Sequence, residues 1–345
     1  MKALVKSKPG VGHVGIVEVE EPRCGDDQIK LEVGFCGVCG TDLHVLHDTF
    51  RNYPPVILGH EFSGTVVETG KDVSHVTIGD PVTVLPASAV ICGVCIHCRS
   101  GRYMFCPKRR GMGHGVNGAF ARYVVVRKDQ AYKIPDGLGL DECALCEPFA
   151  AALQAVTEVT NVRVGDVALV SGPGPIGLMC LKILAAEGIK TIVAGTAQDA
   201  ARLEAARRFG ASVVVNASEQ NLIDVVLAET QGAGVDVAFE CAGHATSAAS
   251  CLDALKRLGR YTQVGIFGKP VTLNFDTIFF KQLQVAGSVG YTVHTWERLM
   301  KILAQRKVRL DDLITHRLPL ARWQEAFELC EQKQTIKVLI SPDET

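Results

Sequence analysis

The strongest constraint on the fold is the alternation of apolar runs with helical segments in the second half of the sequence. Apolar runs at Val167–Val170, Thr191–Ala194 and Val213–Val215 are each followed by a segment of helical composition. Further strands are expected at Val235–Phe239, Arg260–Ile266 and Gln284–Val289, and helices at Pro175–Glu187, Asp199–Phe209, Leu222–Glu229 and His244–Leu258. About six strands alternating with helices predict an α/β fold, with a doubly wound parallel sheet covered on both faces.

The first half of the sequence has a different pattern. Short β-rich segments separated by Gly, Pro or Asp occur at Val14–Val19, Gln28–Val33, Phe62–Glu68, Asp80–Leu85 and Ala119–Val126. The tail has helical patterns at Thr295–Gln305 and Leu320–Glu331 and a strand at Lys337–Ile340. Because the tail is too short for a core of its own, we expect it to pack on the first half. A chain of 345 residues fits two domains at about 150 residues each.

A glycine-rich turn follows the first apolar run of the second half. Residues 172–177 read Gly-Pro-Gly-Pro-Ile-Gly, which matches G-x-G-x-x-G between a strand and a helix. In that context the three glycines allow a tight turn, close approach of a pyrophosphate and helix–strand packing. The alternative is an ordinary strand–helix turn that binds nothing. The expected cofactor contacts are Gly172, Gly174, Pro175, Ile176 and Gly177.

The sequence does not distinguish NAD from NADP. The second strand of a dinucleotide-binding fold usually ends in an acid that binds the ribose hydroxyls. Here the corresponding place reads Gly195-Thr196-Ala-Gln, without an acid, and Asp199 has the spacing of a helix cap with Thr196. Thr196 or Arg202 would then be available to a ribose 2′-phosphate.

Four cysteines lie in a segment without other periodicity, residues 86–118. Cys92, Cys95, Cys98 and Cys106 follow the spacing C-x2-C-x2-C-x7-C. Four thiolates complete a tetrahedron around zinc and leave no open position. We therefore predict a structural zinc site that holds this loop in a fixed conformation. An iron–sulfur cluster and plain buried thiols are the alternatives.

A second group of residues has the composition of an open zinc site. Cys39 is followed by Gly59-His60-Glu61 and later by Glu147-Pro148. One thiolate, one imidazole and carboxylates suit zinc and leave a position for a substrate oxygen. Taken singly, Cys39 could be a small buried residue, His60 a polar residue at a turn, and Glu61 a cap.

Together these motifs resemble the zinc-containing medium-chain dehydrogenases, and specifically their polyol branch, of which sorbitol dehydrogenase is typical. The resemblance rests on Cys39-Gly-Thr41-Asp42-Leu-His44, Gly59-His60-Glu61, the four-cysteine loop, Glu147-Pro148 and the glycine turn, in the family order over nearly the whole chain. It implies a GroES-like catalytic domain at residues 1–153 and 292–345 and a Rossmann domain at residues 154–291.

The resemblance also implies roles for individual residues. Cys39, His60 and Glu61 correspond to the catalytic zinc ligands, and Glu147 to an acid that binds this metal directly or through water. Thr41 and His44 correspond to positions associated with proton transfer. Cys36, three residues before Cys39, has no ligand role in the family and is interpreted as packing.

Two positions bear on the substrate and its neighbourhood. Gly290 stands where sorbitol dehydrogenases carry an arginine at the substrate end of the site, so sorbitol itself does not follow from the resemblance. His114, between Gly113 and Gly115, either lies near the substrate cleft or serves only to turn a loop.

The function expected from these residues is hydride transfer between a secondary alcohol, such as a polyol, diol or sugar alcohol, and NAD or NADP, with two Zn²⁺ per chain. An amino-acid alcohol such as threonine is the alternative substrate, and a non-enzymatic cofactor-binding relative is the alternative class. Glu-Pro at 147–148 departs from the Asp-Pro of threonine dehydrogenases. The run at Gln284–Val289 is an edge strand in the family, which implies a homodimer or homotetramer.

Composition argues against other classes of protein. The chain has 36 basic and 37 acidic side chains and a net charge of −1, whereas nucleic-acid binding needs a basic surplus. No apolar stretch reaches the ~18 residues of a membrane span, and the N-terminal residues lack the pattern of a secretory signal. Thirteen cysteines without such a signal indicate metal or redox chemistry in the cytoplasm rather than disulfides.

Overall fold

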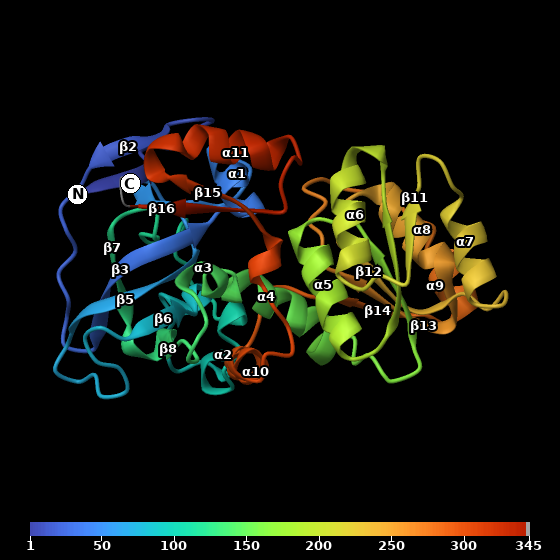
Figure 1. The fold of residues 1–345 in the computed structure, drawn as a ribbon, viewed down its shortest axis with the longest axis horizontal. Helices are drawn as coiled ribbons and strands as arrows, with labels where there is room; N and C mark the ends of the chain where they lie inside the picture. The colour runs from blue at the N-terminus through green and yellow to red at the C-terminus, as the bar shows by residue number, and fades with distance from the viewer. Residues whose placement is uncertain (343–345) are drawn as a thin grey trace. The chain divides into compact units, whose positions relative to one another are not determined.

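A computed structural model describes residues 1–342, which form two compact units. The first unit comprises Met1–Glu147 together with the residues from Thr292 onward, and the second comprises Pro148–Tyr291. The second unit is therefore an insertion within the sequence of the first (Figure 1). No helix among the described residues is both long enough and apolar enough to cross a membrane.

The second unit is built on a six-stranded sheet in the order β11-β10-β9-β12-β13-β14, in which every adjacent pair is parallel. The strands are β9 (Val167–Ser171), β10 (Lys190–Gly195), β11 (Val213–Asn216), β12 (Val235–Glu240), β13 (Leu255–Gln263) and β14 (Gln284–Gly287). This is the doubly wound order of a Rossmann fold, so the predicted fold class is confirmed.

Helices connect these strands and cover both faces of the sheet. They are α5 (Pro175–Ala186), α6 (Ala200–Arg208), α7 (Leu222–Glu229), α8 (Ala245–Ala254) and α9 (Phe275–Lys281), and α4 (Cys146–Leu153) with a π-helical turn (Gln154–Val159) precedes them. In Figure 1, α5 and α6 lie on one face and α7, α8 and α9 on the other. Central-strand residues such as Leu169 and Phe239 are fully buried, as expected for a sheet covered on both sides.

One helix is shorter than the sequence predicts. The helix expected over His244–Leu258 ends at Ala254, and Leu255 begins β13, where it pairs with Val235. Leu258 has a φ of 63°, which a helix does not allow. Sheet pairing therefore overrides the helical composition of these last residues.

The first unit contains two β-sheets, one of three strands in the order β2-β1-β4 and one of seven that runs β15-β16-β3-β5-β6-β8, with β7 also paired to β3. The strands are β1 (Lys2–Lys6), β2 (Val14–Glu18), β3 (Gln28–Gly37), β4 (Val56–Ile57), β5 (Glu61–Thr69), β6 (Pro81–Val84), β7 (Tyr123–Arg127), β8 (Ala131–Lys133), β15 (Ile314–Pro319) and β16 (Lys337–Ser341). Their apolar side chains share one core with residues of the last helix.

Short helices join the strands of the first unit. They are α1 (Gly40–Leu46), α2 (Ile96–Arg99), α3 (Leu140–Cys143), α10 (Val293–Ala304) and α11 (Trp323–Glu331), with 3-10 turns at Pro86–Ser88, Tyr103–Phe105, Lys128–Gln130, Asp311–Leu313 and Leu320–Arg322. The tail belongs to this unit because β16 pairs antiparallel with β3, with Ile340 opposite Cys36. The last strand thus lies beside the end of β3, which leads directly into Cys39.

The strand expected over Ala119–Val126 is only partly formed. Strand β7 begins at Tyr123, whereas Ala119 and Phe120 donate backbone hydrogen bonds to Gly59 and Leu58 at 2.9 Å each. These residues therefore bind the segment that precedes β5 rather than extending β7. This pairing fixes the chain around Gly59 immediately before His60.

Candidate active site

Cys39, His60 and Glu61 converge at the end of the β3–β5 pair. Cys39 is the N-cap residue of α1, and Glu61 is the first residue of β5, directly opposite Gly37 of β3. Their candidate ligand atoms (one sulfur, one nitrogen and one oxygen) all lie within 4.8 Å of one another. Gly59 has a φ of +87°, and this turn aims His60 into the group.

The charges around His60 favour a cation. Burial alone would lower its pKa, but the neighbouring Cys39, Asp42 and Glu147 raise the pKa well above its ordinary value. Its Nδ1 atom is buried without a hydrogen-bond partner and lies 3.7 Å from Asp42 Oδ1. A buried imidazole among acidic groups is the environment in which a metal ion replaces a proton.

Asp42 is a functional residue that sequence reasoning left without a role. Its carboxylate accepts hydrogen bonds from the backbone N–H of Cys39 at 2.9 Å and of Gly59 at 3.3 Å. It therefore ties the two segments that supply the ligands, while its charge faces His60. Burial raises the pKa of this carboxyl.

Lys337 is a second residue that the sequence did not indicate. From the start of β16 its Nζ atom pairs with Glu61 Oε2 and donates a hydrogen bond to the Val38 carbonyl at 2.8 Å. Both charged side chains are buried, with 3% of Lys337 and 2% of Glu61 exposed. Although burial alone lowers it, the charges of Glu61 and Cys39 raise the pKa of Lys337, which is therefore a cation at neutral pH.

These residues fit a zinc ion. The thiolate, imidazole and carboxylate are all zinc donors, and three protein ligands leave one position for a substrate. Glu147 lies at the start of α4, outside the group of three, and acts on His60 through its charge. Cys36 is fully buried and is not part of the group, consistent with a packing role.

The two expected proton-transfer residues lie on α1, directly after Cys39. Thr41 and His44 are three residues apart, so they share one face of the helix. His44 is exposed, and its Nδ1 atom lies 3.0 Å from Thr49 Oγ1. Of these two residues, His44 is the more exposed.

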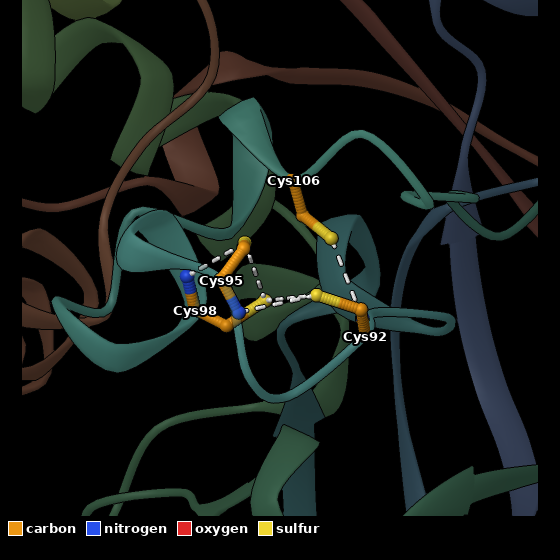
Figure 2. A group of neighbouring side chains, drawn as sticks. All are labelled: Cys92, Cys95, Cys98 and Cys106. Carbon is orange, nitrogen blue, oxygen red and sulfur yellow. Dashed lines mark hydrogen bonds between the residues drawn. The ribbon is translucent and has the colours of Figure 1, made fainter.

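The four cysteines of the loop form a closed cluster (Figure 2). The sulfur of Cys98 lies 3.9 Å from that of Cys92 and 3.5 Å from that of Cys95. A tetrahedron with zinc–sulfur bonds of about 2.3 Å separates its sulfurs by about 3.8 Å. Backbone N–H groups of Cys95 and Val94 lower the pKa of Cys92 to about 6, which favours the thiolate that a metal needs. The cluster therefore fits a structural zinc ion.

The glycine turn has the geometry of a phosphate-binding site. Gly172 follows β9 with a φ of +100°, and a Cβ on Gly177 would lie 2.0 Å from the Gly172 carbonyl oxygen. A Cβ on Gly174 would meet nothing within 4 Å. The first and third glycines are thus required by the turn itself, whereas the second leaves open space beside the N-terminus of α5, which begins with Pro175 and Ile176.

The end of β10 holds the remaining expected cofactor residues. The backbone N–H and hydroxyl of Thr196 donate to Asp199 Oδ2 at 3.0 and 2.9 Å, so Asp199 completes the capping box of the 3-10 turn Ala197–Asp199 that precedes α6. Arg202 lies with its Nη1 atom 3.9 Å from Asp199 Oδ1, and 10% of its side chain is exposed. A Cβ on Gly195 would lie 2.8 Å from the Pro173 ring, so this glycine lets β10 approach the turn.

Comparison with known proteins identifies the family. Residues 25–136 match the alcohol dehydrogenase GroES-like domain, and residues 175–305 match the zinc-binding dehydrogenase domain. The chain is 36% identical over 343 residues to the sorbitol dehydrogenase of Halalkalibacterium halodurans, with 99% of each chain covered. It belongs to the zinc-binding alcohol dehydrogenases.

Other members of this family differ in substrate. The D-arabitol-phosphate dehydrogenase of Enterococcus avium is 34% identical and covers 100% of this chain and 99% of its own. The L-threonine 3-dehydrogenase of Pyrococcus horikoshii is also 34% identical, with 98% of each chain covered. A zinc-binding dehydrogenase of Sinorhizobium meliloti solved with NADP has a TM-score of 0.88 at 31% identity and covers 99% of each chain. This zinc-binding dehydrogenase is therefore an NAD(P)-dependent enzyme that acts on secondary alcohols.

Proposed function

We propose that this dehydrogenase oxidises the secondary hydroxyl of a polyol to a ketone, with Cys39, His60 and Glu61 as its catalytic zinc ligands. The observation that carries the proposal is the convergence of these three donors within 4.8 Å, next to Asp42 and Glu147. When bound there, zinc supplies Lewis acidity that favours loss of the alcohol proton. The nicotinamide supplies the hydride acceptor.

The residues of the chain then bind and move the proton. The Thr41 hydroxyl accepts the proton of the substrate alcohol and releases its own proton. His44, exposed at the next turn of α1, takes up the released proton and delivers it to water. Glu147 orients a neighbouring hydroxyl of the substrate by accepting its hydrogen bond. The turn at Gly172–Gly177, with Gly195, Thr196 and Arg202, binds the dinucleotide.

Metal analysis and mutation of two cysteines test this assignment. Cys39→Ala should lose one of two zinc ions and nearly all alcohol-oxidising activity while remaining folded. Cys106→Ala should lose the other zinc ion and impair folding. Cys24→Ala, a half-buried thiol outside both clusters, is the matched control and should keep both ions. Full activity in Cys39→Ala would overturn the proposal.

The substrate alternative is an amino-acid alcohol such as threonine, because threonine dehydrogenases are also relatives. A steady-state comparison of polyols, vicinal diols and threonine, each with NAD and NADP, distinguishes the two. Threonine as the best substrate would replace the polyol assignment without affecting the zinc chemistry.

The enzyme is proposed to form a homodimer or homotetramer through the edge of its six-stranded sheet. Strand β14 lies at that edge, and large apolar side chains near it are exposed: Phe275 (71%), Phe279 (75%), Phe280 (68%), Val285 (51%) and Val289 (58%). Pairing of β14 with the same strand of a second copy would cover this edge. Sedimentation of the wild type and of Phe279→Asp tests it, since a monomeric wild type would refute the proposal.

The compartment is proposed to be the reducing cytoplasm. All thirteen cysteines are free in the structure, and three of the eight outside the metal clusters, Cys24, Cys241 and Cys330, are partly exposed. These three thiols would be open to oxidation in an oxidising compartment. Both proposed zinc sites also require reduced thiolates.

A further inference from the structure

The loop that contains His114 is packed directly against the metal-binding segment. Gly118 donates a backbone hydrogen bond to Ile57 at 2.8 Å, and a Cβ on Gly118 would lie 2.0 Å from the Gly59 carbonyl oxygen. The loop therefore cannot move away from Gly59 without breaking this contact. A Cβ on Gly113, directly before His114, would lie 3.0 Å from the Gly59 carbonyl oxygen, so the loop also lies beside the segment that carries His60.

Arg109 lies beside His114 in this loop. The position of a Cβ on Gly111 would be 2.8 Å from His114 Nε2 and 3.2 Å from Arg109 Nη1. The guanidinium and imidazole groups thus both approach the space that a side chain on Gly111 would occupy. Arg109 Nη1 also donates to the Ala87 carbonyl at 3.3 Å, which fixes its direction.

Two more arginines are stacked on a tyrosine that is bonded to the same loop. The Tyr53 backbone N–H donates to the His114 carbonyl at 2.8 Å. The Cζ atoms of Arg110 and Arg51 lie 4.4 Å and 5.0 Å from the centroid of the Tyr53 ring. Stacking presents the guanidinium N–H groups in a fixed plane while both side chains remain exposed.

Two members of this arginine cluster (Arg51, Arg109 and Arg110) add positive charge without an acidic neighbour among the described residues, namely Arg51 and Arg110. Within residues 1–342, neither Arg51 nor Arg110 has a carboxylate within 4.0 Å. The chain as a whole is balanced, at 36 basic and 37 acidic side chains. Neighbouring cations without acidic partners repel one another, and planar guanidinium groups bind phosphate oxygens in a bidentate manner.

We propose that the substrate is a polyol that carries a terminal phosphate monoester, and that the arginine cluster binds this phosphate. The inference rests on the proposed function, because it assumes that the reacting hydroxyl lies at Cys39, His60 and Glu61. The acidic groups around His60 repel a dianion, so the phosphate must lie at the other end of the substrate. Arg51 and Arg110 then select phosphorylated over neutral polyols.

The first test compares matched substrates. Steady-state kinetics on the zinc-loaded enzyme should give a higher kcat/KM for a pentitol or hexitol phosphate than for the same polyol without phosphate. Because a lost hydrogen bond to a charged group commonly weakens binding by one to two powers of ten, Arg51→Met and Arg110→Met should each raise the KM for the phosphate ester about 10- to 100-fold. The ratio of kcat/KM between ester and neutral polyol should fall accordingly.

Arg122→Met is the matched control. Arg122 is also stacked on a tyrosine of the first unit, with its Cζ atom 5.2 Å from the Tyr123 ring centroid, but its Nη2 atom lies 2.9 Å from Glu32. This substitution should leave the ester-to-polyol ratio unchanged. Inorganic phosphate, compared with chloride at equal ionic strength, should compete with the ester in the wild type and less in the Arg51→Met/Arg110→Met double variant.

Three results would overturn the inference. They are equal kcat/KM values for ester and polyol, an ester-to-polyol ratio that Arg51→Met and Arg110→Met leave unchanged, and a preference for a sugar acid over the phosphate ester. In each case the enzyme still oxidises an alcohol, so the proposed function stands. If neither ester nor polyol is oxidised and Cys39→Ala behaves like the wild type toward every alcohol, the proposed function itself fails.

Discussion

Replacing Lys337 with methionine should reveal how strongly the buried ion pair supports the first unit. Methionine keeps much of the volume of lysine but leaves the Glu61 carboxylate, 2% exposed, without its cation. Removing one partner of a buried pair typically costs about 3–5 kcal/mol. We expect this loss in the free energy of unfolding of the metal-free protein. The Lys337→Met/Glu61→Gln double variant should recover most of it, because no unpaired charge remains buried.

The same substitution should have a smaller effect when zinc is present. A zinc ion bound by Glu61 neutralises the carboxylate that Lys337 no longer pairs with. The substitution lowers the free energy of unfolding by one amount in the metal-free protein and by a smaller amount in the zinc-loaded protein. By the thermodynamic cycle, every 1.4 kcal/mol of difference between these two losses corresponds to about tenfold tighter zinc binding. Lys337→Met should therefore bind zinc more tightly than the wild type, which competition against a chromogenic chelator measures.

Urea unfolding followed by tryptophan fluorescence measures the stability. Trp296 and Trp323 both lie in the first unit, so the signal reports the part of the chain that contains the pair. The four-cysteine site is emptied or filled alike in every variant, and its contribution cancels in the comparison. Lys301→Met, at an exposed position on α10, is the control and should change stability by less than about 0.5 kcal/mol. A metal-free cost for Lys337→Met below about 1 kcal/mol would refute the reasoning.

Other substitutions give further predictions. Gly174→Ala should weaken nucleotide binding at least tenfold, measured by titration with NADH and NADPH, without lowering Tm, because its Cβ meets only open space. Gly177→Ala should lower both the nucleotide affinity and Tm, because its Cβ would lie 2.0 Å from the Gly172 carbonyl oxygen. Equal Tm losses would contradict this. Burial, then the charges of His60 and Arg109, lowers the pKa of His114 from 6.5 to about 3. Below pH 6.5 the unfolded chain binds a proton that the folded chain does not. The free energy of unfolding therefore decreases as the pH is lowered, by up to about 2 kcal/mol at pH 5. His114→Gln should remove this loss in urea unfolding at pH 7.5 and 5; an unchanged pH dependence would argue against it.

The structural cluster and the nucleotide turn could be predicted because their information is local. Cys92 and Cys106 are close in sequence, and the spacing of the four cysteines favours a closed site. The strand–helix alternation likewise predicts a parallel sheet. The end of α8 was missed because Leu255 has helical neighbours in sequence, while its pairing with Val235 depends on a distant strand.

The electrostatic surroundings of the proposed catalytic site could not be predicted in this way. Lys337 and Glu61 are separated by 276 residues, and a lysine ahead of an apolar strand gives no sign of a buried partner. The stacking of Arg51 and Arg110 on Tyr53 also depends on loops brought together by tertiary structure. The residue types in the sequence predicted which donors could bind a metal. The groups that balance the charge of these donors could be identified only from the three-dimensional structure.

The discontinuity of the first unit determines when its buried ion pair can form during synthesis. Cys39, His60 and Glu61 leave the ribosome early, but β16, which carries Lys337 and pairs with β3, follows only after the whole inserted Rossmann unit. Until then Glu61 lacks the cation it pairs with in the finished protein, so nascent chains hold an incomplete site. The charge balance that Lys337 gives to Glu61 is thereby restricted to chains translated through the last strand.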